Sequence, residues 1–269
     1  MEGSIMTKSK ADNLQMENSK IDRLQMGLQI NDLNKSFNGV TLFKDFNLSL
    51  AESTITCILG PSGCGKSTLL NIIGKVIPPD SGSLVGFDGK IFSYIFQEPR
   101  LLPWKTVRGN IEFVLDSNLS PSSRRREADR LINNVQLDGF ANYYPSQLSG
   151  GMRQRVSIAR AFACHSDIIL MDEPLNGLDF SLKQNMIKWF SQIWKEDRRT
   201  VIFVTHNVDE ALLLGNEIVV LSEPPVSTLT RLTIQEPSGE RSPEEPHLKE
   251  LKQTLEKHLS LAKVPHITF

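Results

Sequence analysis

The sequence contains few cysteines, and they lie far from any metal-binding pattern. Cys57, Cys64 and Cys164 are the three cysteines of this 269-residue chain, and they stand in apolar or loop surroundings. Their spacing matches no thiolate metal site. Unpaired thiols of this kind are typical of a reduced, cytosolic compartment, and that is the compartment we expect.

Long apolar runs and an excess of charge are also missing. No run approaches the length of a membrane span, and residues 1–4 do not begin a signal peptide. Thirty basic residues face 31 acidic ones, so the totals give no electrostatic reason to expect a nucleic-acid partner. The basic run 124–126 lacks interleaved aromatic residues, and we interpret it as a solvated helix face. If the protein works at a membrane, another chain must supply the spanning part.

What the sequence does contain is a glycine-rich loop between a strand and a helix. The apolar run 55–59 predicts a buried strand, and leucines and isoleucines recur at helical spacing over 69–73. Between them stands the pattern G-x-x-x-x-G-K-[ST], which in this context indicates a phosphate site rather than an ordinary Gly/Ser turn with a surface lysine. The residues expected to contact a nucleoside triphosphate are Gly60, Pro61, Ser62, Gly63, Cys64, Gly65, Lys66, Ser67 and Thr68.

The physical reasons for this expectation differ along the loop. Glycines let successive backbone N–H groups point inward at an anion, and the positive end of the following helix adds to the attraction. The ammonium group of Lys66 would reach the terminal phosphates, and the Ser67 hydroxyl would sit on Mg²⁺. By itself the loop predicts only that a nucleoside triphosphate binds.

The rest of the chain predicts an α/β fold. Strand-like alternation over 27–50, with Asn38-Gly39 as a hairpin turn, indicates an antiparallel β layer ahead of the loop. Alternation of strands and helices after residue 168 indicates a mostly parallel sheet. We expect strands at 83–87, 91–96, 168–171, 200–204, 217–221 and 229–234, and helices at about 67–76, 124–135, 151–163 and 180–195. Asp88-Gly89 predicts a hairpin between the first two strands, and Ser122 or Ser123 a cap for the second helix.

Two acidic residues follow the apolar strand at 168–171. Ligands of α/β sheets gather at the carboxyl ends of strands, so Asp172 is placed to hold Mg²⁺ directly or through water. Glu173 is placed to orient and deprotonate a water molecule that attacks the γ-phosphate. Alone, the pair would be an ordinary strand end with solvated acids. The phosphate loop makes the catalytic interpretation the better one.

A second glycine stretch precedes the helix at 151–163. Leu148, Ser149, Gly150, Gly151 and Met152 would expose N–H groups and a hydroxyl to an anion, although such a stretch alone is more often a helix cap without a ligand.

Taken together, GPSGCGKS at 60–67, LSGG at 148–151 and ILMDEP at 169–174 resemble the ATP-binding subunit of an ABC transporter. Gln97, Leu178-Asp179 and Thr205-His206 stand between and after these motifs in the family's order. The resemblance spans about 28–221.

The resemblance assigns roles to further residues. It implies that Phe37 stacks on adenine, and a phenylalanine ring can do so because base stacking needs only a π face. The alternative is that Phe37 is a core residue. Gln97 would reach Mg²⁺ and the attacking water. The implied metal ligands are therefore Ser67, Gln97 and Asp172. His206 would contact the γ-phosphate and act with Glu173 and Gln97 in catalysis.

The resemblance also implies a dimer. The signature stretch 148–152 would close over ATP bound to a second ATPase subunit, and Asp179 would line the seam between the two. Two copies would then share two composite ATP sites. The signature carries Met152 where many family members have glutamine.

The implied architecture is a P-loop NTPase with three parts. A polar tail occupies 1–26. The ATPase domain covers 27–222, with a RecA-like, mostly parallel sheet, an N-terminal antiparallel β-subdomain and a helical signature subdomain at about 98–163. Residues 223–269 would form a strand, a linker and an amphipathic helix whose apolar face carries Leu248, Leu251, Leu255 and Leu259.

Residues 96–104, FQEPRLLPW, resemble the nitrate/sulfonate/taurine branch of bacterial importers, which includes bicarbonate systems. The implied function is ATP hydrolysis that powers uptake of a small solute. The implied partners are integral membrane permease subunits and a periplasmic or lipid-anchored solute-binding protein, with this chain peripheral on the cytoplasmic face of the membrane. The solute stays open between a sulfonate, nitrate, bicarbonate and a pyrimidine vitamin precursor.

The sequence disfavours two other functions. A soluble, non-transport ABC ATPase acting on DNA or ribosomes would carry a long coiled-coil insertion, for which 68–148 leaves no room, or a second phosphate loop. A module that binds ATP without turnover is disfavoured because Glu173 and His206 are both present.

Overall fold

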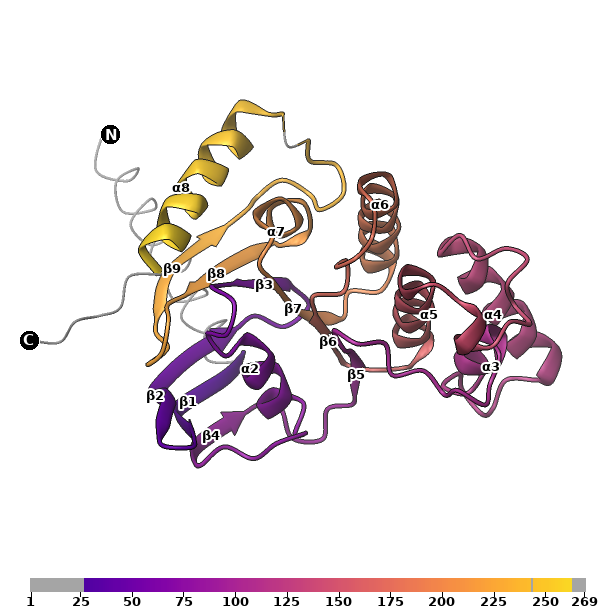
Figure 1. Ribbon diagram of the computed structural model, residues 1–269, viewed down its shortest axis with the longest axis horizontal. Coiled ribbons are helices and arrows are strands. Elements are labelled where there is room, and N and C mark those ends of the chain that lie inside the picture. Colours follow the sequence, from indigo (N-terminus) through magenta and orange to yellow (C-terminus); the bar gives the residue numbers. More distant parts are fainter. Residues whose placement is uncertain (1–26, 243, 263–269) are drawn as a thin grey trace, which may run out of the picture.

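The computed structural model describes residues 27–242 and 244–262, which form two sheets with helices on both sides of the larger one (Figure 1). The predicted polar tail 1–26 lies outside the described residues. No helix within the described ranges is long and apolar enough to cross a membrane.

The smaller sheet is antiparallel and has the strand order β2-β1-β4. Its strands are β1 (Leu28–Phe37), β2 (Val40–Leu50) and β4 (Ser81–Val85). Asn38 and Gly39 both have positive φ, 49° and 82°, as the hairpin turn between β1 and β2 requires. The predicted hairpin is therefore confirmed.

The larger sheet has six strands in the order β5-β6-β7-β3-β8-β9. Five of them are parallel, and the last runs antiparallel to its neighbour. The central strands are apolar and completely buried, as expected for a parallel sheet covered on both faces. The bounds are β3 (Ile55–Leu59), β5 (Phe92–Ile95), β6 (Ile168–Asp172), β7 (Thr200–Thr205), β8 (Glu217–Leu221) and β9 (Thr228–Thr233).

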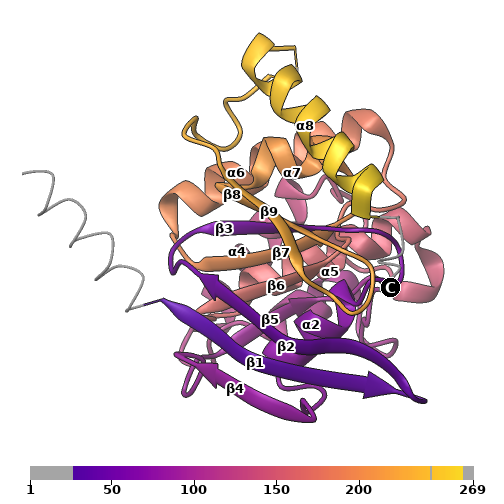
Figure 2. The same cartoon turned by 90° about the vertical axis from the view of Figure 1, so that its left-hand side faces the viewer.

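Side chains of the central strands alternate between two apolar cores, because successive residues point to opposite faces. Ile58 and its neighbours on one face pack against α2 (Lys66–Ile73) and the smaller sheet. The other face, on which Cys57 lies, packs against a layer of helices that covers the upper side of the sheet in Figures 1 and 2. That layer contains α5 (Gly150–Ala163), α6 (Phe180–Glu196), α7 (Val208–Leu214) and α8 (Pro246–Ala262).

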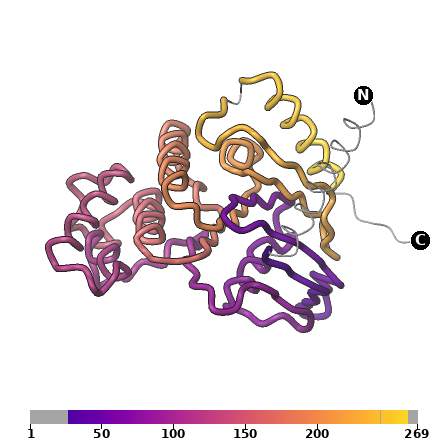
Figure 3. The backbone as a smooth tube through the Cα atoms, turned by 180° about the vertical axis from the view of Figure 1, so that it is seen from behind, coloured from indigo at the N-terminus to yellow at the C-terminus, as the bar shows by residue number. Residues whose placement is uncertain are grey.

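A helical cluster projects from the β5–β6 edge of the sheet, opposite the smaller sheet (Figures 1 and 3). It consists of α3 (Val107–Glu112), α4 (Pro121–Asn134), the N-terminal part of α5 and a short 3₁₀ helix, Pro145–Gln147. Ser120 caps α4 by accepting a hydrogen bond from the backbone N–H of Ser123. The predicted cap at Ser122 or Ser123 is therefore wrong. Pro121 favours the first helical position, so the helix begins earlier in the chain than predicted.

Two further predictions differ from the structure. The hairpin predicted at Asp88-Gly89 is wrong, because β4 pairs with β1 in the smaller sheet while β5 pairs with β6 in the larger one. Gly89 has the positive φ of a turn, 74°, but the chain uses that turn to pass from one sheet to the other. Helix α7 was not predicted, because it is short and follows a strand directly.

Candidate active site

The glycine-rich loop holds its lysine in place through backbone carbonyls. The Lys66 ammonium donates hydrogen bonds to the carbonyl oxygens of Gly60, at 2.9 Å, and Pro61, at 2.7 Å, and the residue is only 5% exposed. An ammonium group has three donors, so these contacts orient it while leaving one for a ligand. The loop thus fixes a positive charge at the start of α2.

Two glycines of the loop adopt conformations that other residues avoid. Gly63 and Gly65 have φ of 81° and 103°. A Cβ atom on Gly65 would also lie 2.9 Å from Cδ2 of Leu42, whereas one on Gly63 would meet nothing within 4 Å. The loop is therefore curled, and it packs closely on β2 at Gly65.

Sheet topology brings the candidate residues to one edge. Strands β6, β7 and β3 are parallel neighbours, with Asp172 paired to Val204 and Leu59 to Thr205. Their carboxyl ends therefore coincide, which places the phosphate loop, the two acids and His206 at the same edge of the sheet. Gln97, exposed shortly after β5, follows the next parallel strand at that edge.

Asp172 carries the clearest electrostatic signature of a cation site. Burial raises the pKa of its carboxyl, a hydrogen bond from Ser67 opposes that shift, and the charges of Glu173 and Lys66 pull in opposite directions. Its Oδ1 is buried and has no hydrogen-bond partner within the described part of the chain. A buried, unpaired carboxylate oxygen beside a serine hydroxyl is the donor set that a hard cation such as Mg²⁺ prefers.

Glu173 is held in an unusual backbone conformation beside His206. Its φ is 46°, and its backbone N–H donates to the Val204 carbonyl at 2.9 Å. One carboxylate oxygen lies 3.0 Å from Nδ1 of His206, and the other accepts a hydrogen bond from Asn176 at 3.2 Å. A strained residue that presents a carboxylate at a strand end is typical of a functional position.

Phe37 ends β1 and is 46% exposed. Lys35 lies over its ring, with the ammonium 5.2 Å from the ring centroid. The alternative interpretation as a core phenylalanine is therefore wrong, because nearly half of the residue is exposed.

The signature stretch lies elsewhere in the chain. Ser149 caps α5 by accepting a hydrogen bond from the Met152 N–H at 3.3 Å, while Leu148 is buried and Gly150 exposed. The N-terminal part of α5 belongs to the projecting cluster, and α2 lies on the opposite side of the sheet (Figures 1 and 3). The structure does not bring the signature and the phosphate loop together within one chain. Asp179 caps α6 by accepting from Leu182 at 2.9 Å.

The sequence analysis did not identify Glu210 and Lys183, which form an ion pair beside the site. Glu210 is 5% exposed, and it bonds to Thr205, the residue before His206, and to Lys183 of α6. A signal for Glu210 exists in the sequence, because Asn207 three residues earlier has the spacing of a helix-capping pair.

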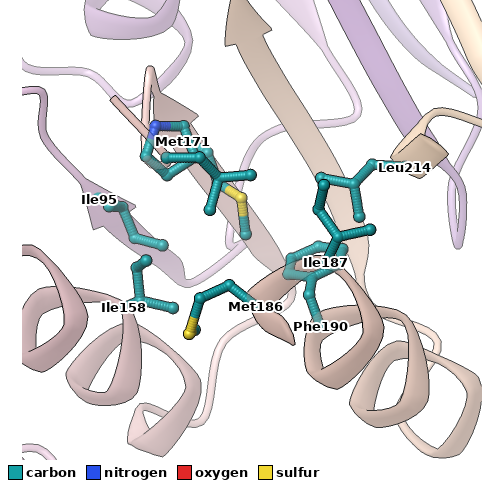
Figure 4. A pocket seen from close by; sticks show the side chains of 9 residues that line it. Ile95, Ile158, Met171, Met186, Ile187, Phe190 and Leu214 are labelled. Atoms are coloured by element: carbon teal, nitrogen blue, oxygen red, sulfur yellow. The ribbon is translucent and has the colours of Figure 1, made fainter. Parts of the chain in front are cut away.

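A small apolar pocket lies between the sheet, α5 and α6, and Met171 and Pro174, on either side of the two acids in the chain, help to line it (Figure 4). Its volume is about 10 Å³, roughly the minimum that one water molecule needs. The side chains that surround it are apolar, so it is a packing gap and offers a ligand no polar contact. Its lining is Ile95, Ile158, Met171, Pro174, Leu175, Met186, Ile187, Phe190 and Leu214.

The fold and this edge of the sheet define a class: an α/β P-loop NTPase with a buried, unpaired carboxylate oxygen and a glutamate–histidine pair at the sheet edge of its phosphate loop. Residues 43–176 match the family model for ABC transporters. The chain belongs to the ABC transporter family, whose ATP-binding proteins bind nucleotide and hydrolyse ATP to drive transport.

Similar curated proteins cover most of the chain. An uncharacterized ABC transporter ATP-binding protein of Methanocaldococcus jannaschii is 38% identical over 240 residues, 84% of this chain and 90% of that protein. A nitrate import ATP-binding protein of Synechocystis is 38% identical over 230 residues, 81% of this chain and 86% of its own length. An aliphatic sulfonates import ATP-binding protein of Pseudomonas syringae is 41% identical over 211 residues, 78% and 89% of the two chains.

Solved structures of the family have the same fold. A dimeric ATP-binding cassette in a post-hydrolysis state, bound to ADP and Pi, superposes with a TM-score of 0.70 at 30% identity. The match covers 78% of this chain and 99% of that one.

Proposed function

We propose that the chain is the ATP-hydrolysing subunit of an importer for a small anionic solute and works as a homodimer with two shared ATP sites. The observation that carries the proposal is the Glu173–His206 pair, 3.0 Å apart, at the sheet edge that also holds Lys66 and Asp172. This edge offers a phosphate cradle, a cation ligand and a candidate base together.

Nucleotide binding is assigned to the loop and to Phe37. The backbone N–H groups of residues 62–68 and the Lys66 ammonium contact the phosphates, and the exposed Phe37 ring stacks on the adenine. The unpaired Oδ1 of Asp172 and the hydroxyl of Ser67 would hold Mg²⁺, with Gln97 as a further ligand. Bound Mg²⁺ would neutralise charge on the β- and γ-phosphates.

Hydrolysis is assigned to Glu173. Its carboxylate orients a water molecule for in-line attack on the γ-phosphate and accepts a proton from that water. His206 holds the Glu173 carboxylate at Nδ1 and contacts the γ-phosphate with its other ring nitrogen. Asn176 restrains the second carboxylate oxygen. Ser149, Gly150 and Gly151 of the second copy complete each site, and Asp179 lies at the seam.

The transport role is supported by relatives named as importer subunits for nitrate and aliphatic sulfonates. A sulfate/thiosulfate import ATP-binding protein of Synechocystis is also 38% identical, over 207 residues. These names favour transport over a soluble, non-transport ATPase, and they favour an oxyanion as the solute. We infer that the chain docks on membrane permease subunits at the cytoplasmic face, fed by a solute-binding protein.

The catalytic assignment is tested by Glu173→Gln. The variant keeps the shape of the side chain but removes the base, so turnover should fall by roughly 100-fold while ATP still binds and holds the dimer closed. ATPase rates and ATP-dependent dimerisation by light scattering measure both effects. Glu256→Gln, on the exposed face of α8, is the matched control. Wild-type turnover in Glu173→Gln would refute the assignment.

The binding assignment is tested by Lys66→Ala, read by the dissociation constant for ATP. Loss of the loop's only ammonium should weaken binding by at least about tenfold, the scale of one charge-assisted contact to phosphate. Unchanged affinity would contradict the phosphate cradle.

The transport assignment is tested in cells that lack this chain. Uptake of labelled nitrate and of an alkanesulfonate should fall for one of the two solutes and return with the wild-type chain but not with Glu173→Gln. If neither uptake changes, nitrate and alkanesulfonates are not the solute of this importer.

A further inference from the structure

Glu210 is a buried carboxylate that the proposed chemistry does not use. It lies in the first turn of α7 and is 5% exposed. One of its oxygens accepts a hydrogen bond from the Thr205 hydroxyl at 2.8 Å, and the other accepts from the Lys183 ammonium at 2.9 Å. Both oxygens are thus occupied by partners from different elements.

The contacts of Glu210 enclose the backbone on both sides of His206. The Thr205 hydroxyl, which donates to Glu210, also accepts a hydrogen bond from the N–H of Asn207 at 3.1 Å. The Asn207 side chain in turn accepts from the N–H of Glu210 at 3.1 Å. His206 stands between two residues that this closed network fixes. Its own side chain is 54% exposed and contacts Glu173.

Lys183 connects this network to the beginning of α6. It is the fourth residue of that helix, and its backbone N–H donates to the carbonyl of Asp179 at 2.9 Å. Helices α6 and α7 lie side by side on one face of the sheet (Figures 1 and 2). The ion pair therefore joins the turn that begins at Asp179 to the turn that holds His206.

Stability alone is a weak reason for such a pair. Removing two charges from water costs about as much free energy as their attraction returns, so a well-packed apolar pair would stabilise the fold equally well. What a bonded pair adds is a defined geometry, because each oxygen of Glu210 has one partner in one direction. Geometry matters at His206, since a misplacement of 1 Å at a catalytic group can cost about 100-fold in rate.

We propose that Glu210 is the positioning residue for His206 and that Lys183 couples this position to the turn at Asp179. The inference rests on the proposed function, which gives His206 and Asp179 their roles at the γ-phosphate and the dimer seam. A displacement of the first turn of α6 when two copies meet then reaches His206 through one ion pair. Closure at the seam and readiness for hydrolysis become linked.

The experiment compares Glu210→Gln and Lys183→Met with the matched control Lys252→Met. The control removes an ion pair of similar length, 2.7 Å, from Asp209 in the same turn of α7, but that pair does not touch Thr205. We expect kcat to fall roughly 10- to 100-fold in the two test variants, with the dissociation constant for ATP changed by less than about twofold. Lys252→Met should keep the wild-type rate, and Lys183→Arg should restore most of it.

A double-mutant cycle with His206→Ala identifies the route of the effect. If Glu210 acts through His206, the double variant His206→Ala/Glu210→Gln is no slower than His206→Ala alone. If the double variant loses rate by the product of the two single-variant factors, the inference is overturned. A Lys183→Met rate equal to that of Lys252→Met would also overturn it. Melting temperatures of all variants separate loss of turnover from loss of folded protein, and Lys183→Met carries the test if Glu210→Gln fails to fold.

The two levels of proposal fail differently. Wild-type turnover in both Glu173→Gln and His206→Ala would refute the proposed catalytic site, and with it this inference. A slow His206→Ala variant beside a fast Glu210→Gln variant would refute the positioning role alone.

Discussion

At the scale of single residues, the two positive-φ glycines of the phosphate loop differ in what surrounds them. We predict that Gly63→Ala lowers the free energy of unfolding by about 1–3 kcal/mol, the cost of an unfavourable φ. Gly65→Ala should cost about 1–3 kcal/mol more, because its Cβ would also lie 2.9 Å from buried Leu42. Urea unfolding of the nucleotide-free variants measures both values. Equal losses would mean that Leu42 moves aside without cost.

The three thiols should differ in reactivity. Burial raises the pKa of Cys57, Cys64 and Cys164, with the charge of Arg199 opposing the shift at Cys164. A raised thiol pKa means less thiolate at pH 7.5, so iodoacetamide should label the native protein slowly, and the rate should rise about tenfold per pH unit below the pKa. Cys164, which is half-buried, should react first. Mass spectrometry identifies the labelled site, and labelling of Cys64 as fast as Cys164 would contradict the buried position of the Cys64 thiol.

At the scale of elements, the C-terminal segment closes the end of α7. The last carbonyls of a helix need partners from outside it. Arg241 supplies them, because its guanidinium donates to the carbonyls of Leu212 and Gly215 at 2.7 and 2.6 Å. Burial lowers the pKa of Arg241 to about 10, so the group still carries its charge at neutral pH.

Arg241→Met should therefore destabilise the protein. Loss of the guanidinium leaves buried carbonyls without donors, and we expect a decrease of about 2–4 kcal/mol in the free energy of unfolding. Lys252→Met breaks a partly exposed ion pair between Lys252 of α8 and Asp209 of α7. This change should lower the free energy of unfolding by less than about 1 kcal/mol. Chemical denaturation compares the two variants. A loss in Arg241→Met as small as in Lys252→Met would mean that water replaces the guanidinium at the end of α7.

How much of this could be predicted depends on the range of the interaction. The central strands were predictable, because the short apolar runs 168–171 and 200–204, with a helical segment between them, are typical of a buried parallel sheet. The divergence of β4 and β5 was not, because the Asp88-Gly89 turn is the same whichever sheet each strand joins. Likewise, the strand-end pattern indicates Glu173, and the family resemblance indicates His206. Their 3.0 Å contact depends on how β6 and β7 pair.

At the scale of the whole molecule, the separation of the signature from the phosphate loop predicts complementation between two inactive variants. Lys66→Ala damages the loop. Gly150→Glu damages the signature, and it should leave the chain folded, since a Cβ at Gly150 meets only an Arg153 nitrogen at 3.9 Å. An acidic residue is also favourable at a helix N-terminus. Its charge would repel the phosphates of ATP held by the other copy.

If the two copies share their sites as proposed, each variant alone should form dimers in which both sites are defective. In a mixed dimer, one site combines both defects, whereas the other combines an intact loop with an intact signature. An equal mixture that exchanges subunits freely should therefore recover up to about a quarter of wild-type turnover, as expected for random pairing in a symmetric dimer with independent sites. ATPase assays at several mixing ratios, with a maximum near equal amounts, measure the effect. If each chain formed a complete site by itself, no mixture would exceed the sum of the two separate variants, because no chain would contain both intact parts.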